Sequence, residues 1–92
     1  MKHYVGEKGT KLRVDVGQDI TNATQVSLIV KKPDGNTTEW VGTVVDGHYI
    51  EYVVKEGDFN QAGRYILQAR IVAVNGEWFG DRFVLVVYDK FD

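Results

Sequence analysis

The chain has 92 residues, is 43% hydrophobic and contains no cysteine, so it fits one domain, 1–92, without disulfides or thiolate metal sites. Its 11 basic and 13 acidic residues give a formal net charge of −2, and the basic residues are scattered, which leaves no electrostatic footprint for nucleic acid. No segment approaches the roughly 20 apolar residues of a membrane helix, and the amino terminus has no signal-peptide pattern.

The first half of the chain alternates between strands and turns. Polar and apolar residues alternate over 11–16 and again over 25–32, as in strands with one solvated face, and a short strand near 3–5 precedes them. Residues 17–24 are mostly turn formers and predict a loop, with Ile20 as a plug over the end of the domain. Pro33-Asp34-Gly35 predicts a tight turn that ends the second long strand.

The second half continues in the same way. Asp46-Gly47 predicts a two-residue hairpin of the primed type, and Asn75-Gly76 predicts a second hairpin. Gly80 indicates a bulge or a close approach of two backbones. The strands that these turns connect are expected over 37–45, 48–55, 64–74 and 77–88.

The connection before the longest strand is too long for a hairpin and too short for a helical crossover. Within it, Asp58, Ala62 and Gly63 belong to the run Gly-Asp-Phe-Asn-Gln-Ala-Gly, and Tyr65 follows at the start of the strand. In immunoglobulin-like sandwiches a tyrosine at this place turns its hydroxyl back to the upstream backbone. We therefore predict a structural corner here, with the hydroxyl of Tyr65 bonded to backbone near Asp58.

These patterns predict an all-β fold, because no segment shows a 3.6-residue apolar period. The long corner favours two packed sheets over a simple meander. We expect an immunoglobulin-like β-sandwich of about seven antiparallel strands in two sheets, with a small Greek-key barrel as the alternative.

An inventory of reactive groups predicts no catalytic residue, no cofactor and no metal. The single serine, Ser27, lies within a strand, and His3 and His48 are far apart in sequence. The aspartates lie in turn and loop contexts, and no Asp-x-Asp-x-Asp ladder or phosphate-binding glycine loop is present. The chain is therefore not expected to be an enzyme.

Aromatic and apolar residues of the last strand are the candidates for a contact site. Trp78 and Phe79 follow the second hairpin turn, at an end of the sandwich where recognition loops often lie. Val84, Val86 and Tyr88 are expected to face outward, where they would meet another subunit.

Three stretches resemble small immunoglobulin-like proteins encoded in bacteriophages and prophages. They are the glycine-bounded first strand from Tyr4 to Gly17, the Lys32-Pro-Asp-Gly35 turn followed by Glu39-Trp40, and the corner from Gly57 to Gln68. The resemblance covers nearly the whole chain and implies a virion-associated structural or accessory protein of the tail or baseplate, made in the host cytoplasm. It implies other tail proteins or self-association as partners. The alternative is a binding module that recognises a cell-surface glycan or protein through its loop aromatics.

Overall fold

Eight strands and no helix make up the fold in the computed structural model, which describes residues 2–91. The strands are β1 (His3–Tyr4), β2 (Lys11–Asp15), β3 (Gln25–Lys31), β4 (Thr37–Val41), β5 (Thr43–Val45), β6 (Tyr49–Val53), β7 (Gly63–Ala73) and β8 (Gly76–Tyr88). None of the described residues forms a helix that could cross a membrane.

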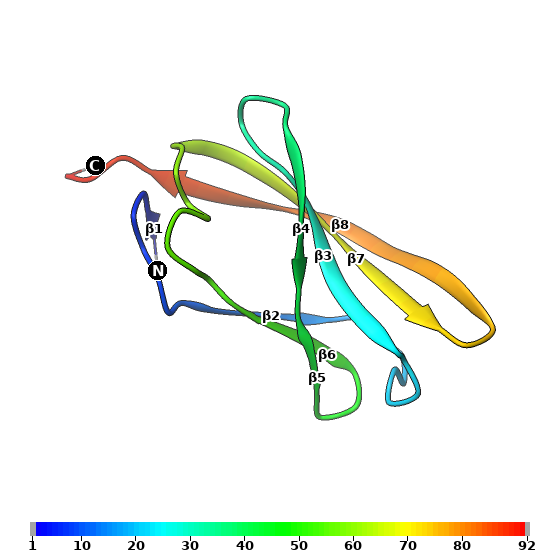
Figure 1. Cartoon of the computed structure of the whole chain (residues 1–92). Helices are drawn as coiled ribbons and strands as arrows, with labels where there is room; N and C mark the ends of the chain where they lie inside the picture. The colour runs from blue at the N-terminus through cyan, green and yellow to red at the C-terminus, as the bar shows by residue number, and fades with distance from the viewer. Residues whose placement is uncertain (1, 92) are drawn as a thin grey trace.

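The strands form two sheets that pack face to face (Figure 1). Sheet A has five strands in the order β1-β8-β7-β3-β4, and sheet B has three in the order β2-β6-β5. All neighbours are antiparallel except β1, which runs parallel to the end of β8. The fold is thus the predicted immunoglobulin-like β-sandwich and not a closed barrel.

The chain crosses between the sheets at Gly42, within what the sequence predicts as one strand over 37–45. That prediction was wrong, because β4 belongs to sheet A and β5 to sheet B. A Cβ on Gly42 would lie 2.6 Å from the carbonyl oxygen of Glu51, so only glycine fits at this crossing. The Gly42 N–H donates to the carbonyl of Val26 on β3 at 3.0 Å, which keeps the crossing tied to sheet A.

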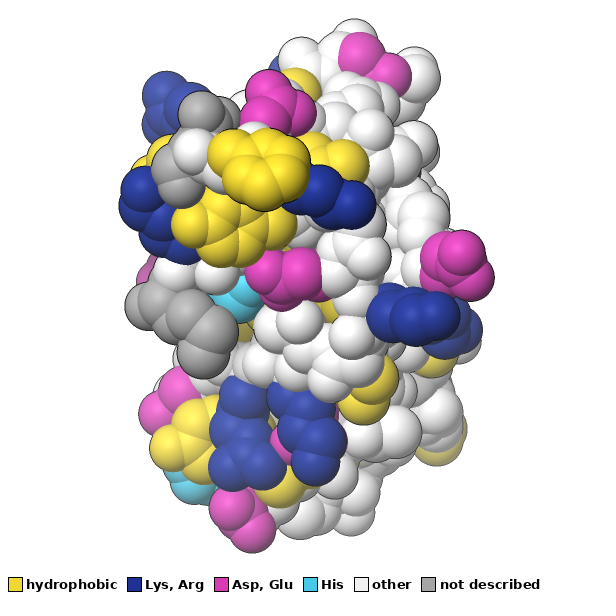
Figure 2. Space-filling model, turned by 90° about the vertical axis from the view of Figure 1, so that its left-hand side faces the viewer, with side chains coloured by type: hydrophobic (Ala, Val, Ile, Leu, Met, Phe, Trp, Pro, Cys, Tyr) yellow, Lys and Arg dark blue, Asp and Glu magenta, His cyan; other side chains and the backbone are white. Residues whose placement is uncertain are grey.

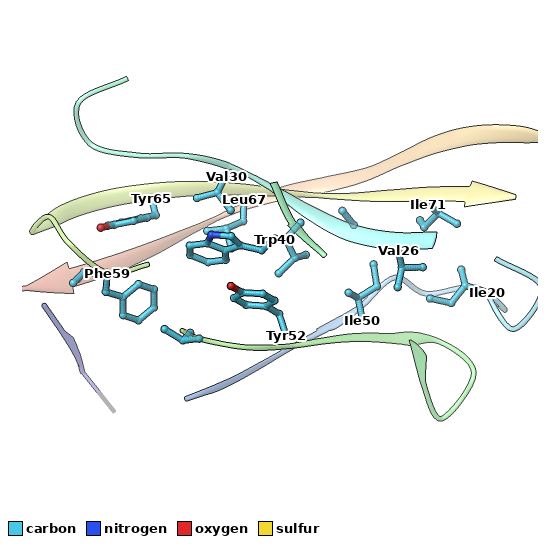
Figure 3. Close-up of a cluster of buried hydrophobic side chains, with 14 residues drawn as sticks. Ile20, Val26, Val30, Trp40, Ile50, Tyr52, Phe59, Tyr65, Leu67 and Ile71 are labelled. Atoms are coloured by element: carbon cyan, nitrogen blue, oxygen red, sulfur yellow. The ribbon is translucent and has the colours of Figure 1, made fainter. Parts of the chain in front are cut away.

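The core lies between the sheets and runs the length of the sandwich (Figure 3). Near its middle, the rings of Trp40 and Tyr52 stack with centroids 5.0 Å apart, and Phe59 lies beside Trp40 at 6.1 Å. Ile20 is buried at the far end, as the sequence predicts for a plug. The buried hydrophobic residues are Ile20, Val26, Leu28, Val30, Trp40, Ile50, Tyr52, Val54, Phe59, Tyr65, Leu67, Ala69, Ile71 and Val87.

The predicted corner connects β6 of sheet B to β7 of sheet A. Tyr65 is fully buried, and its hydroxyl donates to the carbonyl of Gln61 at 2.8 Å and accepts from the Gln61 N–H at 3.2 Å. The corner is confirmed, but the partner is Gln61, not backbone near Asp58. Asp58 instead accepts hydrogen bonds from the hydroxyl of Tyr52 and from the N–H of Lys55. Its carboxylate thus joins the corner to β6.

The Pro-Asp-Gly turn docks onto this corner. The side chain of Gln61 accepts from the N–H of Asp34 at 3.1 Å and donates to the Asp34 carboxylate at 2.9 Å. A Cβ on Gly63 would lie 3.0 Å from the ring of Pro33, so the missing side chain allows this close approach. The Lys32–Gly35 turn and the corner from Gly57 to Gln68 are far apart in sequence but contact each other in the fold.

The two predicted hairpins form with different turns. Asp46 and Gly47 both have positive φ, at 53° and 76°, as a primed turn requires. Val45 pairs with Tyr49, however, so the loop has three residues, Asp46 to His48, and the predicted two-residue hairpin was wrong in length. In the other hairpin Ala73 pairs with Gly76, so the two loop residues are Val74 and Asn75, neither of which has positive φ. The turn lies one residue earlier than Asn75-Gly76 predicts, and Gly76 is the first residue of β8, close to the ring of Trp78.

Both termini lie at the same end of the molecule, and the β7–β8 hairpin forms the opposite end (Figure 1). On the end that carries the termini, acidic and basic side chains are interspersed with hydrophobic ones (Figure 2). The described residues of this face therefore present no extended field of one sign.

Candidate functional site

Trp78 and Phe79 are neighbours in β8 but lie on opposite faces of sheet A. Trp78 pairs with Ile71, whose side chain is buried in the core, whereas Phe79 pairs with Arg70 on the outer face. The two residues are 46% and 55% exposed. The structure thus separates the two residues that the sequence suggested as one contact site, because side chains alternate along a strand.

The loop over 17–24 packs against the same face as Trp78. Buried Ile20 anchors it, with its N–H donating to the carbonyl of Gly47 at 2.8 Å. At the end of the loop, the N–H of Thr24 donates to the carbonyl of Val72 at 2.8 Å. The backbone of the loop is therefore held at both sheets, on the side of the domain where Trp78 lies.

Trp78 and this loop enclose a groove of about 250 Å³. Apolar side chains come from Ile20, Ala23, Ile71 and Ala73, and the indole ring of Trp78 lies among them. The polar lining residues are Gln18, Asp19, Asn22 and Asn75. We call this set the Trp78 groove.

The polar groups of the groove combine one carboxylate with three free amides. Asp19 accepts from the N–H and the hydroxyl of Thr21, at 2.9 and 2.8 Å, and the N–H bond chiefly lowers the pKa of Asp19. Asp19 is therefore ionised at neutral pH and is the one charged residue of the lining. Within the described chain, the amides of Gln18, Asn22 and Asn75 make no hydrogen bond, so their donors and acceptors are available to a ligand.

The ring of Trp78 lies close over the backbone of Gly76. A Cβ built on Gly76 would be 3.1 Å from two ring carbons. The missing side chain lets the indole lie against the strand, which restricts its rotation and presents one aromatic face next to the groove.

Val84 and Val86 face outward from sheet A, as the sequence predicts. They oppose Ile66 and Arg64 of β7 and are 45% and 39% exposed. Tyr88 is half-buried, with its ring 6.3 Å from that of Tyr4. Their role as contacts remains a prediction.

The outer face also carries a polar cluster on neighbouring strands. Ser27, which is fully buried, donates its hydroxyl to Glu39, and Arg70 binds both Glu39 and Glu77. The Ser27 hydroxyl and the Arg70 guanidinium lower the pKa of Glu39. Each of these groups is satisfied by another, so the cluster joins β3, β4, β7 and β8 and leaves no free nucleophile or base.

The two histidines each lie beside a single acidic residue. His3 lies 3.5 Å from Glu7, and His48 lies 3.0 Å from Asp15, in separate parts of the fold. No described group of three or more His, Cys, Asp or Glu residues is positioned to hold a metal ion. The two imidazoles, a ligand type that transition metals prefer, are thus not brought together.

Sequence reasoning did not find the polar half of the Trp78 groove. Gln18, Asp19, Asn22 and Asn75 read as ordinary loop residues, because each lies in a run of turn formers. The signal that was available is Ile20, since an apolar residue within a polar loop indicates that the loop folds onto the core. The partner of that loop depends on the register of β8, which the sequence does not reveal.

The fold defines the chain as a two-sheet β-sandwich, and comparison with solved structures agrees. The crystal structure of CopC from Methylosinus trichosporium OB3b matches with a TM-score of 0.64 at 14% sequence identity, over 99% of this chain and 87% of that chain. Neither a family model nor a curated protein matches the sequence. For this chain the likeness establishes the fold.

The same comparison contradicts the virion-associated function expected from the sequence. The structure that it finds is CopC and not a phage tail or baseplate protein. Two of the three stretches that carry the resemblance are, moreover, the turn and the corner that dock on each other, so these two serve the fold. The tail or baseplate role is therefore withdrawn.

Proposed function

We propose that the domain is a non-catalytic module that binds a neutral saccharide unit in the Trp78 groove. The observation that carries this proposal is an indole ring, 46% exposed, beside three uncommitted amide side chains. An aromatic face packs against the C–H groups of a sugar ring, while amides donate to and accept from its hydroxyls. Binding of a sugar through these contacts would require no catalytic residue.

The size and charge of the groove limit the class of sugar that could bind there. Its volume of about 250 Å³ is just below the roughly 300–1,000 Å³ of pockets for drug-sized ligands, which favours a single sugar ring. Ionised Asp19 and the lack of a basic residue in the lining disfavour acidic sugars. Neutral sugars are thus the class that the groove supports best.

The proposal is tested by titrating the full chain with a panel of neutral mono- and disaccharides while recording ¹H–¹⁵N correlation spectra. At about 10 mM sugar, a ligand with a Kd near 1 mM, or about −4.1 kcal/mol, would be close to saturation. We expect shifts of the Trp78 indole N–H and of the amides of Gln18, Asn22 and Asn75. If no sugar moves these signals, saccharide binding is excluded at this affinity.

Matched variants on one strand assign the site. Trp78→Ala should abolish the shifts, and Trp78→Phe should retain part of the affinity, because a smaller aromatic face remains. Phe79→Ala, which removes a similarly exposed aromatic residue from the opposite face, should bind like the wild type. Equal losses in Trp78→Ala and Phe79→Ala would contradict the groove as the site.

A further inference from the structure

An apolar patch on the outer face of sheet A lies among basic residues. Ile66 of β7 opposes Val84 of β8 on one side and Lys31 of β3 on the other. Two residues before Ile66, on the same face, is Arg64, which opposes Val86. A third basic residue follows the same alternation on β8, at the margin of the sheet. We call this set the Ile66 patch: Lys31, Arg64, Ile66, Arg82, Val84 and Val86.

The basic side chains of the Ile66 patch have no acidic partner. Among the described residues, Lys31, Arg64 and Arg82 are exposed and form no ion pair. The other two arginines of the chain are both paired with glutamates. An unpaired guanidinium has all of its N–H donors available to a carboxylate from outside, and it can bind both oxygens of that carboxylate at once.

The carboxylates on the same face are already bound. The strands of sheet A place two of them on the outer face, Glu39 and Glu77, and Arg70 binds both. This face therefore holds four basic and two acidic side chains, a net charge of +2 in a chain whose formal net charge is −2. The unpaired part of the positive charge lies at the Ile66 patch. Charge complementarity thus favours an acidic partner.

The spacing of the two unpaired arginines favours an extended ligand over a single small anion. Arg82 opposes Gln68, which lies four residues after Arg64 on β7, so about 13 Å of strand separates the two arginines. Ile66 and Val84 lie between them. A ligand that meets both guanidiniums must therefore carry more than one negative charge and cover apolar surface between its charged groups.

A flat patch of this kind suits a protein segment better than a lipid surface. Its apolar side chains are two valines and one isoleucine on a sheet face, and the basic side chains around them are longer. Lipid binding would require apolar groups to enter the bilayer by roughly 5–10 Å, which these short side chains cannot do past the basic ones. Apolar side chains of a protein can instead reach down between the basic residues.

From these observations we propose that the Ile66 patch binds an acidic amphipathic segment of a partner protein. The apolar side chains of that segment pack on Ile66, Val84 and Val86, and its carboxylates pair with the three unpaired basic residues. The proposal specifies the chemistry of the contact that the sequence predicts for Val84 and Val86. It is independent of saccharide binding, because none of the six residues lines the Trp78 groove.

Selection from a random peptide library on the full chain tests the proposal. The displayed peptides have about 15 residues, or four helical turns. We expect the enriched peptides to combine several acidic residues with apolar ones, and a synthetic copy of the most enriched peptide to bind more weakly as salt is added. Its binding should shift the backbone amide signals of Arg64, Ile66 and Val84 in ¹H–¹⁵N spectra and leave the indole signal of Trp78 in place.

Charge reversals assign the contact to the patch. Arg64→Glu should weaken binding of the selected peptide about tenfold, since an attractive pair becomes repulsive, and Lys31→Glu should act in the same direction. Arg64→Lys keeps the charge but loses the planar guanidinium, so it should weaken binding less than Arg64→Glu does. Lys55→Glu, the same charge change on an exposed residue outside both sheets, should bind like the wild type. Thermal unfolding of each variant checks that it is folded.

Three results would overturn the proposal. The first is a library that yields no binding peptide, or only peptides without acidic residues. The second is a pair of folded variants, Arg64→Glu and Lys31→Glu, that bind the selected peptide like the wild type. The third is co-sedimentation of the wild-type chain with vesicles of equal parts phosphatidylcholine and phosphatidylserine that is lost in Arg64→Glu, which would assign the patch to a lipid surface instead.

Discussion

At the scale of single residues, Tyr65 holds the corner through one hydroxyl that both donates to and accepts from the backbone of Gln61. Burial is the main cause that raises the pKa of Tyr65, so the hydroxyl keeps its proton through the physiological range. Two partly buried backbone groups therefore depend on an atom that phenylalanine lacks.

We expect Tyr65→Phe to lower the free energy of unfolding by about 1–2 kcal/mol, because both groups of Gln61 lose their partner. Urea denaturation at neutral pH measures this change. Tyr49→Phe, at a half-exposed tyrosine, is the control and should change stability by less than about 0.5 kcal/mol. An equal effect of the two substitutions would show that the corner does not depend on the hydroxyl.

Gly42 is the second residue on which the fold depends. We expect Gly42→Ala to destabilise the domain by about 2–3 kcal/mol, because the new Cβ would meet the Glu51 carbonyl oxygen at 2.6 Å. Neighbouring Thr43→Ala, at an exposed position, should stay within about 0.5 kcal/mol of the wild type in the same assay. A fully stable Gly42→Ala variant would mean that the crossing tolerates a side chain.

At the scale of elements, Glu39 joins β4 to two other strands of sheet A through Ser27 and Arg70. Its pKa in the folded protein is lower than the ordinary value. As pH falls below about 4.3, the unfolded chain takes up the proton first, so this contribution to stability is present above that pH and is lost toward the folded pKa.

Replacing Glu39 with glutamine should therefore reduce stability at pH 7 and flatten its decline between about pH 5 and pH 3. Urea unfolding at a series of pH values measures both effects. Thr37→Val, on the same face of β4, leaves the carboxylate in place and should keep the wild-type slope. A Glu39→Gln variant with an unchanged slope would contradict the role of this carboxylate.

Sequence patterns predicted the elements better than the sheets to which they belong. Period-two alternation located the strands, and Tyr65 after the glycine-rich run located the corner, because both signals are local. Alternation also continues through Val41, Gly42 and Thr43, so it did not reveal that the chain changes sheets there. The faces of Trp78 and Phe79 and the polar lining of the groove depend on strand register and loop packing, which are non-local.

At the scale of the whole molecule, half of the strand pairs join distant parts of the chain. β3 pairs with β7 across the corner, and the first strand pairs with the last. Loop-closure entropy must be overcome before such contacts stabilise the chain, so folding of this topology is slow.

We expect refolding to take milliseconds to seconds, as in other all-β sandwiches. Stopped-flow fluorescence measures the rate, and the Trp78→Ala variant leaves buried Trp40 as the single reporter. A microsecond refolding phase with full amplitude would show that local contacts dominate instead.

The parallel pairing of β1 with the end of β8 also determines the orientation of the domain when it is attached through one of its chain ends. It brings both chain ends to one pole, and with about 3.3 Å per residue β7 carries the chain roughly 33 Å from Gly63 to Ala73 at the other pole (Figure 1). A tether at either end therefore leaves the indole of Trp78 pointing away from the point of attachment. Fusion partners, surfaces and beads can be joined at the amino or the carboxyl end with the same orientation of the groove.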